Sequence, residues 1–201
     1  MSSQPDLKQE RRKQILDAAE TVFTKRGMDK ARMDDIVHES GLSKGSLYWY
    51  FKSKDAIIQA LLDRVFIDEM RDAEALIYAQ GSSSERLRIF IANVVQEYKR
   101  FEKMLPLAYE FVALAARSKV IRQVIVGYFE RYTAILSEIV RQGVESGEFK
   151  PCDPEDIALS VIALYEGMAM LRFIDRELVD WDRIGDVPIE TILTGLTVEK
   201  H

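Results

Sequence analysis

Residues 31–62 constrain the fold more than any other part of this sequence, because they contain short helical patterns that are interrupted by a glycine. Met33, Ile36 and Val37 recur at the spacing of one face of a helix. Gly41 follows them, and a glycine there can take the left-handed conformation that closes a helix and starts a tight turn. The first half of the stretch therefore predicts a short helix that ends in a turn.

A second short helix is predicted over residues 44–50, with Ser43 as its N-cap. Leu47 and Phe51 lie four positions apart and share the face that must pack inward. The residues expected to point away from that face are Gly45, Ser46, Tyr48 and Trp49. Exposed aromatic side chains on so short a helix leave apolar surface in contact with water unless a partner covers them. Two short helices around a tight turn are typical of a helix-turn-helix motif, so the expected partner is double-stranded DNA.

The start of the next helix supports this interpretation. Ser53 is its predicted N-cap, and Lys54 lies in its first turn, so free N–H groups and an ammonium group converge where a DNA phosphate can bind. The alternative is that Tyr48, Trp49 and Tyr50 are core or subunit contacts. The turn, both caps and Lys54 together favour DNA binding over that alternative.

This segment resembles the N-terminal domain of the TetR family of bacterial one-component regulators. The resemblance covers about residues 10–62 and is carried by ILDAAETVFTKRG, which begins at Ile15, by MDDIVHESGLSKGSLYWYF and by KSKDAIIQALL. It implies a three-helix DNA-binding domain and a larger helical domain for ligand binding and dimerisation. It also implies release from the operator when a small molecule binds.

The resemblance assigns roles to the residues that match the motif. Lys44 opens the recognition helix, and Lys54 matches the lysine that binds phosphate. Family members commonly have Thr or Ser at the start of the preceding helix, where this chain has Ala31 and Arg32, so we expect Arg32 to take over that phosphate contact. The expected DNA-binding residues are Arg32, Ser43, Lys44, Gly45, Ser46, Tyr48, Trp49, Tyr50 and Lys54.

Charge is distributed unevenly along the chain, whose net charge is −5. Residues 1–54 contain 11 Lys and Arg against 8 Asp and Glu, whereas residues 55–201 contain 17 against 25. A basic segment joined to an acidic remainder suits a protein that binds DNA with one surface. We therefore predict a DNA-binding domain over residues 1–54, with a mobile tail over residues 1–7, and a ligand-binding and dimerisation domain over residues 55–201.

Composition narrows the remaining possibilities. With 201 residues and 47% hydrophobic content, the chain can bury a substantial core. A single cysteine, Cys152, and two distant histidines, His38 and His201, argue against a metal site, and no cofactor is expected. The alternative function is a small helical enzyme or binding protein with a coincidental helix-turn-helix. The absence of a glycine-rich phosphate loop or a nucleophile elbow argues against that alternative. The N-terminus lacks the apolar run of a signal peptide, so a cytoplasmic protein is expected.

The rest of the sequence predicts an all-α fold of about nine helices, because no alternating strand pattern occurs. The first helix is expected over residues 8–26. The helices after the DNA-binding segment are expected over residues 53–79, 83–103, 106–117, 119–146, 154–175 and 187–199.

The helix over residues 154–175 is apolar on nearly all sides. Glu166 and Arg172 within it favour burial between its own core and a second subunit over a membrane span. We expect a homodimer formed through residues 154–175 and 187–199, with no membrane partner. The last helix should contribute one apolar stripe to this interface, formed by Ile189, Ile192, Leu193 and Leu196.

Aromatic and sulfur-containing side chains are the candidates for an effector cavity, although each one alone is also a plausible core residue. A cavity built from them would take a small apolar or aromatic molecule. The candidates are Phe66, Met70, Phe90, Tyr98, Phe101, Tyr109, Tyr128, Tyr132, Tyr165 and Met168.

Overall fold

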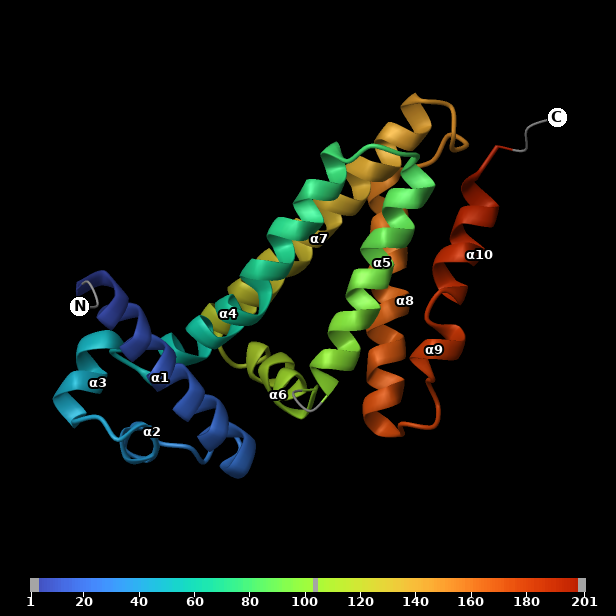
Figure 1. Cartoon of the computed structure of the whole chain (residues 1–201). Helices are drawn as coiled ribbons and strands as arrows, with labels where there is room; N and C mark the ends of the chain where they lie inside the picture. The colour runs from blue at the N-terminus through green and yellow to red at the C-terminus, as the bar shows by residue number, and fades with distance from the viewer. Residues whose placement is uncertain (1–3, 103–104, 199–201) are drawn as a thin grey trace. The chain divides into compact units, whose positions relative to one another are not determined.

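A computed structural model describes residues 4–102 and 105–198. For residues 4–6 and 65–71 it describes the backbone only. The described residues form ten α-helices and one short 3-10 helix, and they contain no β-strand (Figure 1). The predicted all-α fold is confirmed. The chain divides into two compact units, which we call the head (residues 1–67 and 104–126) and the body (residues 68–103 and 127–201).

The head is built around a core to which every one of its helices contributes. Its elements are α1 (Gln4–Arg26), α2 (Met33–Ser40), α3 (Lys44–Tyr50), the start of α4 (Lys54–Ala75), α6 (Leu105–Ala115) and the start of α7 (Lys119–Glu145). Its most deeply buried side chains include Ile15, Phe23, Met28, Ile36, Leu47, Ile57, Ile58 and Ile121. The head is thus larger than the predicted domain over residues 1–54.

Helix α1 begins at Gln4, so residues 4–7 are helical rather than part of a tail. Pro5 lies in the first turn, where its missing N–H costs no hydrogen bond. On the core side, α1 buries an apolar stripe, which consists of Ile15, Leu16, Ala19, Val22 and Phe23.

The body consists of the remaining helices and the loops between them. Its elements are the end of α4, the 3-10 helix η1 (Leu76–Tyr78), α5 (Ser83–Arg100), the rest of α7, α8 (Pro154–Ile174), α9 (Trp181–Ile184) and α10 (Val187–Leu196). Compared with the prediction, α4 stops at Ala75, and a single 3-10 turn replaces its last residues. A capping box starts α5: Ser82 Oγ accepts from Glu85 N at 3.1 Å, and Glu85 Oε2 accepts from Ser82 N at 3.0 Å.

Helix α9 is the element that the sequence analysis missed. It has only four residues, too few to show a helical period, and Asp180 caps it by accepting a hydrogen bond from Asp182 N at 3.0 Å. Trp181 at its start is only 5% exposed and packs in the body core. This short helix therefore anchors the segment between α8 and α10.

The apolar stripe of α10 packs inside its own chain, which corrects the expectation that it forms a subunit contact. Ile189 and Leu193 are each 1% exposed and Leu196 is 7% exposed, all within the body core, and Ile192 is half-buried against the same core. The periodicity correctly predicted a buried face, but the partner of that face is the body itself.

Helix α8, by contrast, leaves much of its apolar surface uncovered. Among the described residues it is the one helix long and apolar enough to cross a membrane by length and composition alone, which is weak evidence because a core helix of a soluble protein can pass the same test. Val161, Tyr165 and Ala169 face the body core. The large exposed apolar residues of α8 are Leu159, Leu164, Met170, Leu171, Phe173 and Ile174.

Candidate DNA-binding surface

The turn between α2 and α3 has the geometry that the sequence predicts. Gly41 has φ 66°, in the left-handed region, and its N–H donates to His38 O at 3.3 Å. Ser43 Oγ accepts from Ser46 N at 3.1 Å and so caps α3. Gln14 of α1 donates through Nε2 to Ser40 O at 2.7 Å and ties the end of α2 to α1. The helix-turn-helix is therefore held by its own caps and by a contact to α1.

Helix α3 packs its predicted inner face into the head core. Leu47 is fully buried and Phe51 is 3% exposed. Trp49 is 62% exposed, as expected for an outward-facing residue. Tyr48 and Tyr50 are half-buried and pack against the head core, so Tyr48 points outward only in part. Of the three aromatic residues, Trp49 is the one most available to a partner.

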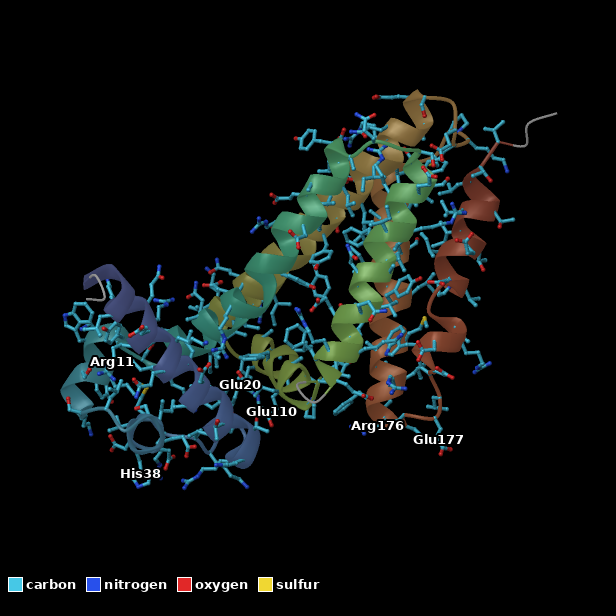
Figure 2. All side chains as sticks on the ribbon, in the orientation of Figure 1. Arg11, Glu20, His38, Glu110, Arg176 and Glu177 are labelled. Carbon is cyan, nitrogen blue, oxygen red and sulfur yellow. The ribbon has the colours of Figure 1, made fainter. Side chains whose placement is uncertain are left out.

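Two basic residues of α1 lie over aromatic rings from the α3 segment. The Nζ atom of Lys8 is 5.5 Å from the centre of the Trp49 ring, and the guanidinium of Arg12 is 5.0 Å from the centre of the Phe51 ring. Figure 2 also labels Arg11 on α1 and His38 on α2. Cationic groups of α1 therefore lie beside the recognition helix.

The predicted polar contacts of α3 are exposed. Lys44 Nζ lies 2.7 Å from Asp34 Oδ1, and both side chains are mostly exposed. A hydrogen bond from Lys44 to this carboxylate raises the pKa of Lys44, so the ammonium stays charged at neutral pH. Ser43, Gly45 and Arg32 are also exposed, whereas Ser46 is half-buried. On α3 itself, Lys44, Gly45 and Trp49 are thus exposed, whereas Ser46, Tyr48 and Tyr50 are half-buried.

Lys54 has an environment that the sequence analysis did not anticipate. Its half-buried side chain donates through Nζ to Met28 O at 2.6 Å and to Ala31 O at 3.2 Å, in the loop between α1 and α2. An ammonium has three hydrogens, so one remains for another acceptor. Lys54 is therefore partly engaged inside the head.

In the body, two of the predicted cavity residues line the same cavity. A cavity of about 190 Å³ lies between the end of α4, α5 and α7, and both Phe90 and Tyr132 line it. Their rings meet nearly perpendicularly with centroids 5.5 Å apart. Leu76 and Val94 add apolar walls, and the polar lining consists of Asp72, Asn93, Gln96 and Glu97. The cavity is thus apolar on one side and polar on the other.

The other predicted cavity residues whose side chains the structure describes lie elsewhere. Tyr98 stacks on Trp181 with ring centroids 5.2 Å apart and donates to Glu166 Oε1 at 3.0 Å. Tyr165 is buried and donates to Gly185 O at 2.8 Å. Of the remaining candidates, Tyr128 contacts the Tyr132 ring, Phe101 lies beside Arg100, Met168 is half-buried in the body, and Tyr109 belongs to the head. The side chains of Phe66 and Met70 lie outside the described residues.

Glu166 is a titratable group of the body with a perturbed environment. Burial raises the pKa of its carboxyl, and the hydrogen bond from Tyr98 lowers it by a smaller amount. Within the described part of the chain, no group of three or more His, Cys, Asp or Glu side chains is placed to hold a metal ion.

A helix-turn-helix that is fixed on the head core and presents an exposed tryptophan defines a DNA-binding protein of the helix-turn-helix class. The chain matches the model of the bacterial regulatory proteins of the tetR family over residues 15–61, and a tetracyclin repressor-like C-terminal domain over residues 86–180. It is 30% identical over 202 residues to the HTH-type transcriptional regulator TtgR from Pseudomonas putida, with 94% of this chain and 90% of TtgR covered. The chain therefore belongs to the TetR family of DNA-binding transcriptional regulators.

Solved structures show the same fold at lower sequence identity. A SmeT–triclosan complex has a TM-score of 0.84 and 22% identity, and the match covers 94% of this chain and 93% of SmeT. SmeT is described as the repressor of the Stenotrophomonas maltophilia multidrug efflux pump SmeDEF. FadR from Bacillus subtilis, solved with stearoyl-CoA, has a TM-score of 0.78 and 21% identity, over 90% of this chain and 97% of FadR.

Proposed function

We propose that this regulator is a homodimeric repressor that binds a palindromic operator through α3 and is released by a small apolar effector held in the body. The observation that carries the DNA-binding part is the exposure of Trp49 on a helix whose opposite face, at Leu47, is fully buried. Because α3 is already fixed by its caps and core, its outward face is available for the major groove without refolding.

Within this proposal, the predicted residues divide into base and phosphate contacts. Trp49, Tyr48 and Gly45 are placed against base edges and the sugar-phosphate wall of the groove, since aromatic and glycine surfaces can approach closely. Lys44, Arg32 and the remaining hydrogen of Lys54 are placed on phosphates. Ser43, Ser46 and Tyr50 complete the surface, with their hydroxyl groups as further phosphate contacts.

The uncovered face of α8 supports the dimer. Leu164 is 46% exposed and Ile174 is 67% exposed, and an apolar helix face of this kind is stable only when a partner covers it. A second copy of α8 is the proposed partner, and the exposed Val187 at the start of α10 contributes in place of the buried stripe of that helix. Two recognition helices in such a dimer must be separated by about 34–36 Å, or by a multiple of one helical turn, to enter successive major grooves.

The cavity lined by Phe90 and Tyr132 is the proposed effector site. Its volume of about 190 Å³ is smaller than the roughly 300–1,000 Å³ of sites for drug-sized ligands, so it suits a molecule of one or two rings. The polar group of Asn93 or Glu97 would orient such a ligand. The ligand in the SmeT complex, triclosan, is a small two-ring molecule and supports an effector of this size, whereas the stearoyl-CoA bound by FadR is too large for this cavity.

Gel-shift titration of labelled DNA flanking the protein's own gene tests the function. We expect sequence-specific binding that weakens steeply with salt, since phosphate contacts release counterions. Addition of triclosan should release the DNA, and DNA should weaken triclosan binding by the same factor. Binding that does not distinguish this DNA from unrelated DNA would contradict the regulator, and tighter DNA binding with ligand would reverse the proposed sign.

A further inference from the structure

We infer that Glu110 and Lys54 are positioning residues for DNA binding, because together they fix the loop that connects α1 to the helix-turn-helix. This inference rests on the proposed function of the head as the DNA-binding unit. All the residues involved lie in the head, and neither the carboxylate of Glu110 nor its helix belongs to the segment that resembles the family's N-terminal motif.

The loop begins where α1 ends, at Gly27. Gly27 has φ 74°, in the left-handed region, and its N–H donates to Phe23 O at 2.8 Å. The next residue, Met28, buries its side chain in the head core with 1% exposed. Ala31 is 2% exposed, and its N–H donates to Gly27 O at 3.2 Å. The loop is therefore a tight, core-packed connection and not a loose linker.

Glu110 lies on α6 and binds the first peptide N–H of this loop. Its Oε2 atom accepts a hydrogen bond from Met28 N at 2.8 Å, across 82 positions of sequence. Glu110 is labelled in Figure 2. Helix α6 is itself fixed in the head core by Leu107 and Phe111, which are 5% and 6% exposed. The carboxylate thus ties the loop to a rigid element that is remote in sequence.

Lys54 lies in the first turn of α4 and binds two carbonyl groups of the same loop. Its ammonium donates to Met28 O and Ala31 O, so the N–H of Met28 is bound by one helix and its C=O by another. A negative and a positive side chain hold opposite sides of one residue. Hydrogen bonds to charged groups are stronger than those between neutral groups, which makes this a firm attachment.

The attachment matters for α3 because the loop leads directly into α2. Arg32 N donates to Asp35 Oδ2 at 2.9 Å at the start of α2, and α2 then runs to the Gly41 turn and α3. If Met28 is released, α2 and α3 keep the Gln14–Ser40 contact and their core packing but lose a fixed entry point. DNA binding requires one orientation of α3, so the loss of this fixed point lowers operator affinity without unfolding the head.

Simple electrostatics predicts the opposite effect, which makes the inference testable. Glu110 is a carboxylate on a unit that binds a polyanion, so removal of its charge alone should strengthen DNA binding. The positioning role predicts that Glu110→Ala weakens operator binding about three- to tenfold, the effect of one lost hydrogen bond. Glu110→Gln should bind at least as well as the wild type, because its amide oxygen still accepts from Met28 N.

The experiment measures operator affinity and its salt dependence for the wild type, Glu110→Ala and Glu110→Gln on the DNA flanking the protein's own gene. Glu10→Ala, which removes an exposed carboxylate of α1, is the matched control for charge and should not weaken binding. Because Glu110 makes no phosphate contact, the slope of log affinity against log salt should be the same for the wild type and for Glu110→Ala. Glu110→Ala that binds as tightly as the wild type, or Glu110→Gln that binds as weakly as Glu110→Ala, would overturn the positioning role.

Hydrogen exchange of the Met28 amide provides a readout that needs no DNA. We expect this amide to exchange faster in Glu110→Ala than in the wild type or Glu110→Gln, while the amides of α1 and α4 stay protected. Equal exchange in all three proteins would overturn the contact even if the proteins bind no operator. If the wild type fails to bind DNA but the Met28 amide responds as expected, the proposed function fails and the attachment of the loop stands.

Discussion

The ring of Trp49 meets the ring of its neighbour Tyr50 edge-on, with centroids 4.7 Å apart and an interplanar angle of 82°. Tyr50 is half-buried against the head core, whereas most of Trp49 is exposed. An edge-to-face contact of this kind is favourable and restricts the indole without burying it. The exposed ring is thus preorganised by a neighbour that is itself fixed by the core.

This arrangement predicts that Trp49 contributes to DNA affinity and little to stability. Trp49→Ala should leave the melting temperature nearly unchanged and cost about 1–3 kcal/mol of specific DNA binding, measured by thermal unfolding and gel shift. Leu47→Ala, on the buried face of the same helix, is the control and should cost about 2–5 kcal/mol of stability. If Trp49→Ala unfolds, the ring is part of the core.

The ion pair between Lys44 and Asp34 predicts opposite effects from its two partners. Lys44→Ala should weaken binding to all DNA sequences alike and reduce the salt slope by about one, since one phosphate contact is lost. Asp34→Asn should strengthen binding, because it frees the ammonium and removes a negative charge from the DNA-binding surface. Weaker binding by Asp34→Asn would mean that the carboxylate instead holds Lys44 in its binding position.

The uncovered face of α8 predicts a dimer that one charge can disrupt. Leu164→Glu should convert the protein to a monomer in sedimentation equilibrium at micromolar concentration, because an unpaired carboxylate in an apolar interface is costly. Val112→Glu places the same change on an exposed position of α6, where Val112 is 54% exposed, and should remain a dimer. A Leu164→Glu protein that stays dimeric would remove α8 from the interface.

The small cavity in the body predicts a variant that binds DNA but does not respond to an effector. Ala73 lines the cavity and is 8% exposed, so Ala73→Leu should fill part of the space. We expect DNA affinity to be retained and release by a small two-ring apolar ligand to be lost, measured by calorimetry and gel shift. An unchanged ligand response would place the effector outside this cavity.

The half-buried carboxyl of Glu166 predicts a pH-dependent stability. Because its pKa is raised in the folded protein, Glu166 contributes stability that is fully present below its ordinary pKa of 4.5 and is lost as the pH rises through the higher folded value. Glu166→Gln has no charge to bury and can still accept the hydrogen bond from Tyr98. Urea unfolding should therefore show Glu166→Gln to be more stable than the wild type at about pH 8 and no more stable at about pH 4.

Glu177→Gln is the matched control for this experiment, since Glu177 is exposed and lies just after α8 (Figure 2). We expect its stability to follow that of the wild type at every pH. If Glu166→Gln also follows the wild type throughout, the carboxyl of Glu166 is solvated in the folded protein.

The helix-turn-helix could be predicted because its signals are local. The turn at Gly41, the cap at Ser43 and the outward position of Trp49 each depend only on residues close by in the sequence. The sequence alone therefore predicts all three. The start of α8 also has a local signal, because Asp153 Oδ1 accepts from Glu155 N at 2.9 Å as an N-cap does.

Features that depend on distant partners could not be predicted. The periodicity of α10 indicates a buried face at Ile189 and Leu193 but does not say whether the partner is the same chain or a second one. Likewise, no local signal connects Lys54 with Met28, which is 26 positions away, or Glu110 with the same residue. Among the aromatic residues of the body, residue type does not separate Phe90 at the cavity from Tyr165 in the core, because both roles favour the same side chains.

The discontinuity of the head has a consequence for recombination between relatives. Leu107, Phe111 and Ile121 are buried in the head core together with residues of α1 and α4. In the sequence, however, residues 68–103 of the body separate them from the N-terminal part of the head. A crossover placed after α4 would therefore pair one parent's helix-turn-helix with the other parent's α6, and would take Glu110 and the loop that it binds from different parents. To transfer DNA specificity between relatives, residues 1–67 and 104–126 must therefore be exchanged together.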